Sequence, residues 1–299
     1  MDLLDKFDAV TILADARISQ ADKNYCETQQ KAYEAAISSY KELAFFWEDM
    51  LRVQEELVGP RSGQFYTDYL ESSQGPTISR YAIEAHIKKL HSIFISAVVD
   101  YFNSQYHVTV SGSDIKETLL PKEPDSYRCE DDEKLRTYHE TMQNLVVKYQ
   151  DIVDQIILRL DGRSFTEQAF YELRTACHNA AWNSYQKKPE FERKKATIRF
   201  TGYKCSCDSW AYSTYWELTE GMKRILRAAA HFETGGYHVY PLGFSDLINY
   251  SRRSNDFIEF PTCEKFQSLK MFKNGRVDLK FASESLAQEF IDTYIGMTL

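Results

Sequence analysis

The stretch LKMFKNGRVDLKF, at residues 269–281, decides the fold of the C-terminal part of this chain. Asn274 and Gly275 lie between apolar residues, which is the strongest short-range signal for a β-hairpin. A two-residue type I′ turn needs positive φ at both central positions, and Asn-Gly supplies it at low cost. The stretch therefore predicts two antiparallel strands that close a sheet and end a domain.

A two-residue turn also fixes the expected register of this hairpin. It places Phe272 opposite Val277, and side chains then alternate between the two faces. The face of Phe272 is expected to continue through Leu279 and Phe281, and the opposite face to carry Leu269 and Met271. A short helix is expected after the hairpin, with Ser283 or Ser285 as its N-cap.

Composition limits the classes of function that the whole chain can have. The chain has 299 residues, enough for one large domain or two smaller ones, and a formal charge of −8. DNA binding would therefore require a local basic patch. The six cysteines are scattered and no signal peptide is recognisable, which favours reduced thiols in a cytoplasm. No apolar run approaches the roughly 20 residues of a membrane span.

A long helix is predicted over residues 19–57, where Gly59-Pro60 stops it. Its apolar residues recur at helical spacing. They are Tyr25, Ala32, Ala36, Tyr40, Leu43, Trp47, Met50 and Leu57. The run Phe45-Phe46-Trp47 is hydrophobic nearly all round, so it is expected to be buried on two sides or to meet another chain. Burial in the core is the interpretation that we favour.

A heptad pattern predicts a second long helix. Its apolar residues alternate steps of three and four, at Leu135, Tyr138, Met142, Leu145, Tyr149, Ile152 and Ile156. With a further helix from residue 165 to about 185, it would form an antiparallel helical hairpin. We therefore expect residues 112–186 to be a projecting, coiled-coil-like arm that mediates self-association. Residues 1–111 and 187–299 would form one α+β base that holds a small antiparallel sheet. The chain as a whole is therefore predicted to be α+β and mostly helical, with the arm projecting from the base.

One basic and aromatic cluster is a candidate partner-binding surface. Its residues are Lys187, Lys188, Phe191, Arg193, Lys194, Lys195, Tyr203, Trp210, Tyr212 and Tyr215. They include aromatic residues of the stretch 205–216, which is expected to be a loop. The cluster is compatible with tracking a nucleic-acid backbone, with a protein-binding hot spot, or with a solvated strand entry.

Motifs for catalysis and for cofactor binding do not stand out in the sequence. It contains no phosphate-binding glycine loop, no G-x-S-x-G and no H-E-x-x-H. Cys205, Cys207, His231 and Cys263 would be the ligands of a zinc site, but structural zinc sites usually have a longer spacer within each pair. We therefore expect no metal, no cofactor and no enzymatic activity, with a metal-dependent hydrolase as a minor alternative.

Three stretches together resemble an uncharacterised domain family of plasmid and phage proteins. They are ISRYAIEAHIKKLH at 78–91 running on to VDYF at 99–102, KKATIRF at 194–200, and FKNGRVDLKF at 272–281. The resemblance covers about half of the chain, and its most specific element is the closing F-K-N-G hairpin. Some members of that family lie beside or are fused to DNA methyltransferases. The expected insertion at 112–186 departs from the family pattern.

A base with a long helical arm is also similar to phage-encoded inhibitors of the Gabija defence system. That resemblance implies a non-enzymatic protein in the host cytoplasm. It implies multimers that surround a bacterial nuclease–helicase complex and block its access to DNA, with the arm making self-contacts and the base binding the host complex. The alternative is a DNA-associated accessory protein of a mobile element, which would use the basic residues between 187 and 195.

Overall fold

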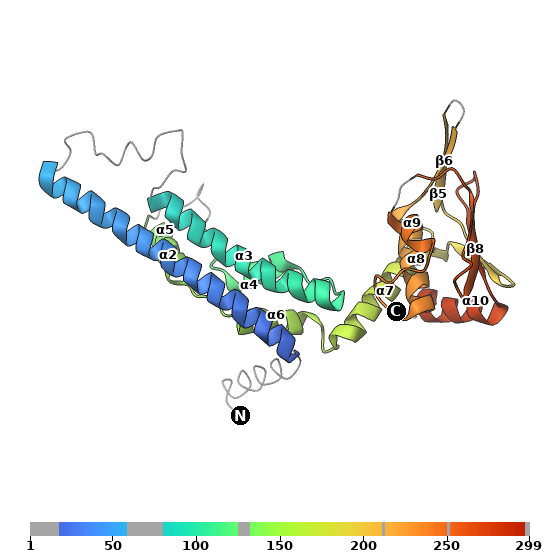
Figure 1. The fold of residues 1–299 in the computed structure, drawn as a ribbon, viewed down its shortest axis with the longest axis horizontal. Coiled ribbons are helices and arrows are strands. Elements are labelled where there is room, and N and C mark those ends of the chain that lie inside the picture. The colour runs from blue at the N-terminus through green and yellow to red at the C-terminus, as the bar shows by residue number, and fades with distance from the viewer. Residues whose placement is uncertain (1–17, 59–79, 125–131, 211–212, 250–251, 297–299) are drawn as a thin grey trace. The chain divides into compact units, whose positions relative to one another are not determined.

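The computed structural model describes residues 18–58, 80–124, 132–210, 213–249 and 252–296 (Figure 1). The fold is α+β, mostly helical with small antiparallel sheets, as the sequence predicted. The chain divides into two compact units, Met1–Phe165 and Thr166–Leu299. They are called the helical unit and the sheet unit below. This division differs from the expected base with an inserted arm, because residues 112–165 belong to the same unit as the N-terminal helices.

Helix α3 forms the centre of the helical unit. The elements of this unit are α2 (Gln20–Val58), α3 (Arg80–Tyr106), α4 (Gly112–Leu119), α5 (Asp132–Asn144) and α6 (Tyr149–Arg159). The other four all contact α3, and Figure 1 shows α2 lying along it. The side chains of Ile95, Val98 and Phe102 are fully buried. Tyr33 of α2 stacks on Phe94 of α3 with ring centroids 4.5 Å apart.

A break at residues 145–148 separates α5 from α6, so the prediction of one continuous heptad helix is wrong. Side chains of α2 satisfy the backbone groups that the break exposes. The amide of Gln30 donates to Val147 O at 3.0 Å and accepts from Tyr149 N at 2.8 Å. The Tyr33 hydroxyl accepts from Val147 N at 3.1 Å. Heptad periodicity is a local signal, and these partners lie more than 100 residues away in sequence.

His91 completes the polar network beneath this break. Since the Tyr33 oxygen accepts from the backbone, its proton is free to donate to His91 Nδ1, 2.8 Å away. His91 Nε2 then donates to Met142 O at 2.9 Å. The ring is fully buried, and burial lowers its pKa. A neutral imidazole with both nitrogens bonded therefore fixes the end of α5 against α3.

The heptad seam expected to mediate self-association packs largely inside its own unit. Five of its seven residues are buried, namely Tyr138, Met142, Tyr149, Ile152 and Ile156. Leu145 is half-buried, and Leu135 is at the margin of exposure. Most of the seam is therefore covered by neighbouring helices of the same chain.

The sheet unit packs helices on one face of a five-stranded antiparallel sheet. Its strand order is β3-β4-β9-β8-β7. These strands are β3 (Phe191–Lys194), β4 (Thr197–Phe200), β7 (Phe257–Glu259), β8 (Phe266–Met271) and β9 (Val277–Phe281). The helices are α7 (Phe165–Ala181), α8 (Glu220–Thr234), α9 (Phe244–Asn249), α10 (Glu284–Phe290) and the π-helix η2 (Ile291–Ile295). One core joins buried residues of α7, α8, α9, α10 and η2 to the inner sheet face.

The β8–β9 hairpin is present, but the predicted register is wrong. Met271, not Phe272, pairs with Val277. The loop holds three residues, because Phe272 N donates to Arg276 O at 2.9 Å and Gly275 N donates to Phe272 O at 2.9 Å. Gly275 has a φ of +81°, as in a type I turn followed by a left-handed residue.

The longer loop brings the apolar residues of both strands to one face. That buried face carries Leu269, Met271, Val277, Leu279 and Phe281. A two-residue turn would have divided this set between the two faces, because a one-residue slip reverses every side chain of a strand. The predicted cap of the following helix is confirmed, since the Ser283 hydroxyl accepts from Leu286 N.

Two short strand pairs complete the sheet unit. Strands β1 (Trp182–Asn183) and β2 (Lys188–Pro189) pair with each other. Strands β5 (Cys205–Trp210) and β6 (Ser213–Leu218) form a two-stranded ribbon, so the expectation of a loop over 205–216 is wrong. The inner part of the ribbon joins the core through Cys205, Trp216 and Leu218.

Candidate functional site

Helix α2 carries two apolar stripes that point in different directions. The first stripe is buried in the helical unit and includes Tyr33, Ile37 and Trp47. The second stripe, called the α2 stripe below, consists of Leu43, Phe46, Met50, Val53 and Leu57. Because successive residues of an α-helix turn by about 100°, the α2 stripe points roughly 120° away from the buried one.

Large apolar side chains of the α2 stripe are exposed to solvent. Phe46 is 67% exposed and Leu57 is 81% exposed. Leu43 and Val53 are also exposed, and Met50 is half-buried. Single exposed apolar residues are ordinary, but a continuous row of them typically marks an interaction surface. The favoured expectation of core burial for Phe45-Phe46-Trp47 is therefore wrong for its two phenylalanines and right for its tryptophan.

The spacing of the α2 stripe is that of a coiled-coil seam. Its residues follow one another by steps of three, four, three and four. They occupy a and d positions over two heptads, where side chains insert between those of a facing helix. The sequence alone contained this signal, but periodicity does not say which of two apolar stripes faces the core.

One edge of the α2 stripe is acidic. Glu42, Asp49 and Glu56 follow one another at seven-residue spacing and therefore form a row along the helix. Arg52 bridges two of them, with 2.7 Å to Asp49 Oδ1 and 2.7 Å to Glu56 Oε1. These groups are exposed, and exposed ion pairs of this kind contribute little to stability. The acidic row therefore borders the apolar seam on its solvent side.

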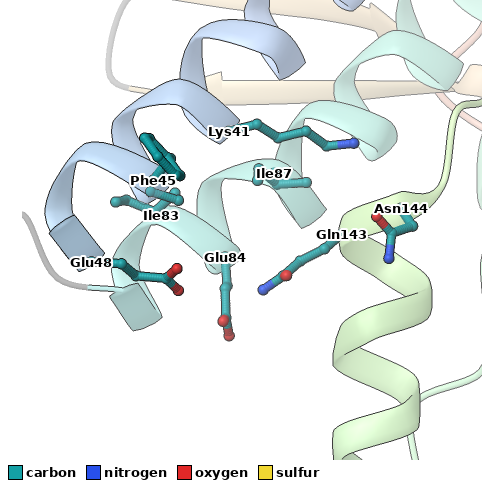
Figure 2. Close-up of a pocket in the computed structure, with 9 residues that line it drawn as sticks. Lys41, Phe45, Glu48, Ile83, Glu84, Ile87, Gln143 and Asn144 are labelled. Atoms are coloured by element: carbon teal, nitrogen blue, oxygen red, sulfur yellow. The ribbon is translucent and has the colours of Figure 1, made fainter. Parts of the chain in front are cut away.

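A small pocket of about 200 Å³ lies next to Phe45, between α2, α3 and α5 (Figure 2). Figure 2 shows Gln143 extending from α5 toward Glu84 of α3, with Lys41 on α2. The volume of this pocket is below the several hundred Å³ typical of ligand sites. We assign no chemistry to it.

The predicted basic and aromatic cluster lies in the sheet unit, where the structure brings only part of it together. Arg193 and Lys194 lie on the edge strand β3, Lys195 follows in the turn to β4, and all three are exposed. Lys187 is exposed in the β1–β2 turn, and Lys188 is exposed at the start of β2. These five residues are the basic part of the cluster.

The aromatic members of the cluster differ in position and in exposure to solvent. Phe191 packs partly against the core, whereas Tyr203 and Tyr215 are exposed. Trp210 ends β5, and Tyr212 lies outside the described residues. The aromatic members therefore come from β3, from the bend after β4 and from the β5–β6 ribbon, and they differ in exposure.

The outer face of the five-stranded sheet carries a row of charges that sequence reasoning missed. The pairing register aligns Glu192, Arg199, Asp278, Lys270 and Phe257 across the five strands. The guanidinium of Arg199 lies 3.4 Å from Asp278 Oδ1. Opposite charges on facing positions stabilise neighbouring strands. Negative and positive residues alternate from strand to strand in this row, so cross-strand ion pairing is enough to explain it.

Charge is distributed unequally between the two units. Residues 1–165 contain 18 Lys and Arg against 28 Asp and Glu, a formal charge of −10. Residues 166–299 contain 18 Lys and Arg against 16 Asp and Glu, a formal charge of +2. The chain's overall negative charge therefore belongs to the helical unit, and the sheet unit is close to neutral.

Two of the four residues considered for zinc, Cys205 and His231, have hydrogen-bond partners of their own. The Cys205 thiol is buried and donates to the carbonyl oxygens of Phe272 and Arg276. His231 Nδ1 lies 2.8 Å from the Tyr294 hydroxyl. Cys207 and Cys263 are half-buried free thiols. Across the described ranges, no group of three or more His, Cys, Asp or Glu side chains is arranged to hold a metal ion.

Comparisons with protein-family models, with curated proteins and with solved structures find no match to this chain. Within the described residues, no helix combines the length and the apolar character that crossing a bilayer requires. The exposed, heptad-spaced α2 stripe is the candidate functional site.

Proposed function

We propose that this chain is a non-enzymatic binding protein that docks on a partner protein through the α2 stripe. One observation carries the proposal: a heptad-spaced row of large apolar side chains is exposed on α2. Burying a side chain such as Phe46 or Leu57 contributes roughly 1.5–3 kcal/mol of transfer free energy. A partner that covers the stripe would bury at least these two side chains.

The resemblance to phage inhibitors suggests the partner. On that basis the partner is a bacterial nuclease–helicase complex of the Gabija type, in the cytoplasm of the host. Docking of this chain would then block access of the complex to DNA. Self-association belongs to the same resemblance. Since most of the predicted seam is buried, an oligomer would have to use another surface.

The test uses the purified full-length chain and a reconstituted nuclease–helicase complex. We expect the two to co-elute in size-exclusion chromatography, and we expect DNA cleavage to be inhibited. The variant Phe46→Asp/Leu57→Asp should lose both properties, because carboxylates would have to be buried without partners. Leu158→Asp is the matched control, since Leu158 is exposed on α6 of the same unit.

Two results would count against the proposal. If the wild-type chain neither co-elutes nor inhibits cleavage, the proposed target is wrong. If the double variant binds the complex as well as the wild-type chain does, the α2 stripe is not the docking surface. Circular dichroism of each variant establishes that it is folded.

DNA binding by the sheet unit is the second candidate function. It is favoured by the exposed Arg193, Lys194 and Lys195 on a unit without net negative charge. We expect affinity for duplex DNA to fall steeply with salt if it exists. Fluorescence anisotropy would compare Lys194→Glu/Lys195→Glu with the control Lys31→Glu/Lys89→Glu in the helical unit. Equal affinities for the two variants would remove this candidate.

A further inference from the structure

The α2 stripe has a defined length and shape, which limit what covers it. From Leu43 to Leu57 it spans 14 residue steps, or about 21 Å at 1.5 Å per residue. Alternating steps of three and four match the side-chain spacing of a second helix. The side chains on one face of a strand repeat every two residues, so their spacing does not match that of the α2 stripe. The fitting element is therefore a helix of at least two heptads.

Charge along the stripe restricts the composition of that helix. Residues 41–57 contain five acidic residues against Lys41 and Arg52, a formal charge of −3. Three of the acidic residues form the row that borders the stripe, Glu42, Asp49 and Glu56. The edge of a coiled-coil seam is where interhelical ion pairs select the partner.

A second copy of α2 would fit this edge poorly. In an antiparallel pair, the acidic row would face the acidic row of the other copy. In a parallel pair, it would face the e positions, which are Trp47 and Gln54. Trp47 is buried in its own unit. Neither arrangement gives the acidic row an opposite charge.

We propose that the α2 stripe binds an amphipathic helix of the partner protein that carries an apolar a/d seam and Lys or Arg along its edge. This inference rests on the proposed docking function and specifies the chemistry of the partner. Basic edge residues would pair with Glu42 and would replace or share Arg52 as the partner of Asp49 and Glu56, while the apolar seam covers Phe46 and Leu57. A helix with Asp or Glu along its edge would be disfavoured, because its carboxylates would face the acidic row.

Two synthetic peptides test this inference on the full-length chain. Both are three heptads long with Leu at the a and d positions, and their edge positions carry either Lys or Glu. We expect the Lys-edged peptide to bind about tenfold more tightly in fluorescence anisotropy, because the acidic row attracts the Lys edge and repels the Glu edge. Its affinity should fall between about 0.05 and 0.5 M NaCl.

Variants of the chain assign the binding to the stripe. Phe46→Asp/Leu57→Asp should abolish binding of the Lys-edged peptide, and the control Leu158→Asp should not. Glu42→Lys/Glu56→Lys should reverse the preference, so that the Glu-edged peptide binds more tightly. The reversal identifies the acidic row, because loss of folding would weaken both peptides.

Several outcomes would overturn the inference. Equal affinity for the two peptides, or binding of neither, would exclude a basic-edged helix. A wild-type dimer in light scattering that Phe46→Asp/Leu57→Asp converts to a monomer would identify a second copy as the occupant. If the peptide preference holds and the nuclease–helicase complex does not bind, only the proposed target fails. If the complex binds through the stripe without a peptide preference, only the partner chemistry fails.

Discussion

At the residue scale, buried polar side chains decide where helices end. Gln30 and Tyr33 on α2 bind the backbone at residues 147 and 149, and His91 binds Met142 O. A buried acceptor or donor left without a partner costs about 1–3 kcal/mol. The interruption between α5 and α6 is therefore stabilised by particular side chains, although the apolar pattern continues across it.

The buried histidine makes the stability of the helical unit depend on pH. Burial lowers the pKa of His91 below its ordinary value of 6.5. The unfolded chain therefore takes up a proton at a higher pH than the folded chain does. The contribution of His91 is complete above pH 6.5 and is lost as the pH falls from 6.5 toward the lowered pKa.

We predict that His91→Gln reduces the pH dependence of the unfolding free energy. Urea unfolding followed by circular dichroism at pH 7.5 and 5.5 measures it for both proteins. The wild-type chain should lose more stability than the variant at the lower pH, and the variant should be about 2 kcal/mol less stable at pH 7.5. Parallel losses in the two proteins would show that His91 is not the titrating group.

At the element scale, the β8–β9 hairpin shows what a sequence signal settles. Asn274-Gly275 correctly predicts a hairpin at this position, but it is compatible with loops of two or three residues. Tertiary contacts distinguish the three-residue loop from a two-residue one. Gly275 O accepts from Lys204 N at 2.7 Å and from Cys205 N at 3.2 Å. The register therefore depends on a segment 70 residues earlier, which no local pattern reveals.

We predict that Gly275→Ala destabilises the sheet unit more than backbone strain at positive φ would do by itself. A Cβ at this position would lie 3.0 Å from the Cα of Tyr203, and φ is +81°. Gly235→Ala is the matched control, since Gly235 has a φ of +72° with nothing within 4 Å of its Cβ position. The unfolding free energy of the control should fall by about 1–2 kcal/mol, the cost of placing a residue with a Cβ in the left-handed region. That of Gly275→Ala should fall by at least about 1 kcal/mol more, because of the close contact with Tyr203.

Thermal unfolding of the two glycine variants measures this difference. Equal losses of stability would mean that the loop moves away from Tyr203 without cost. In that case the close approach would not explain why a glycine occupies position 275.

The α2 stripe shows the corresponding limit for helices. Helical spacing correctly predicts that residues 19–57 form one helix, and Trp47 is buried as expected. Phe46 is the neighbouring residue in the same helix and is also large and apolar, yet it lies on the other stripe. Which stripe is buried depends on where α3 packs, and the sequence of α2 does not contain that information.

At the scale of the whole molecule, the chain consists of two compact units with different charge. The α+β class follows from helical and strand periodicity that is visible in the sequence. The boundary near residue 165 does not, because the helices of 112–165 contact α3 through residues remote in sequence. The predicted basic cluster and the α2 stripe consequently belong to different units, which separates the two candidate functions experimentally.

Hydrogen–deuterium exchange of the full-length chain, alone and mixed with the reconstituted nuclease–helicase complex, would show whether a partner covers the α2 stripe. Backbone amides of a helix exchange more slowly when a partner covers the helix. We expect added protection over residues 43–57, with none at the exposed Leu158 end of α6. Added protection confined to the sheet unit, around residues 191–200, would contradict the claim that the α2 stripe is the docking surface.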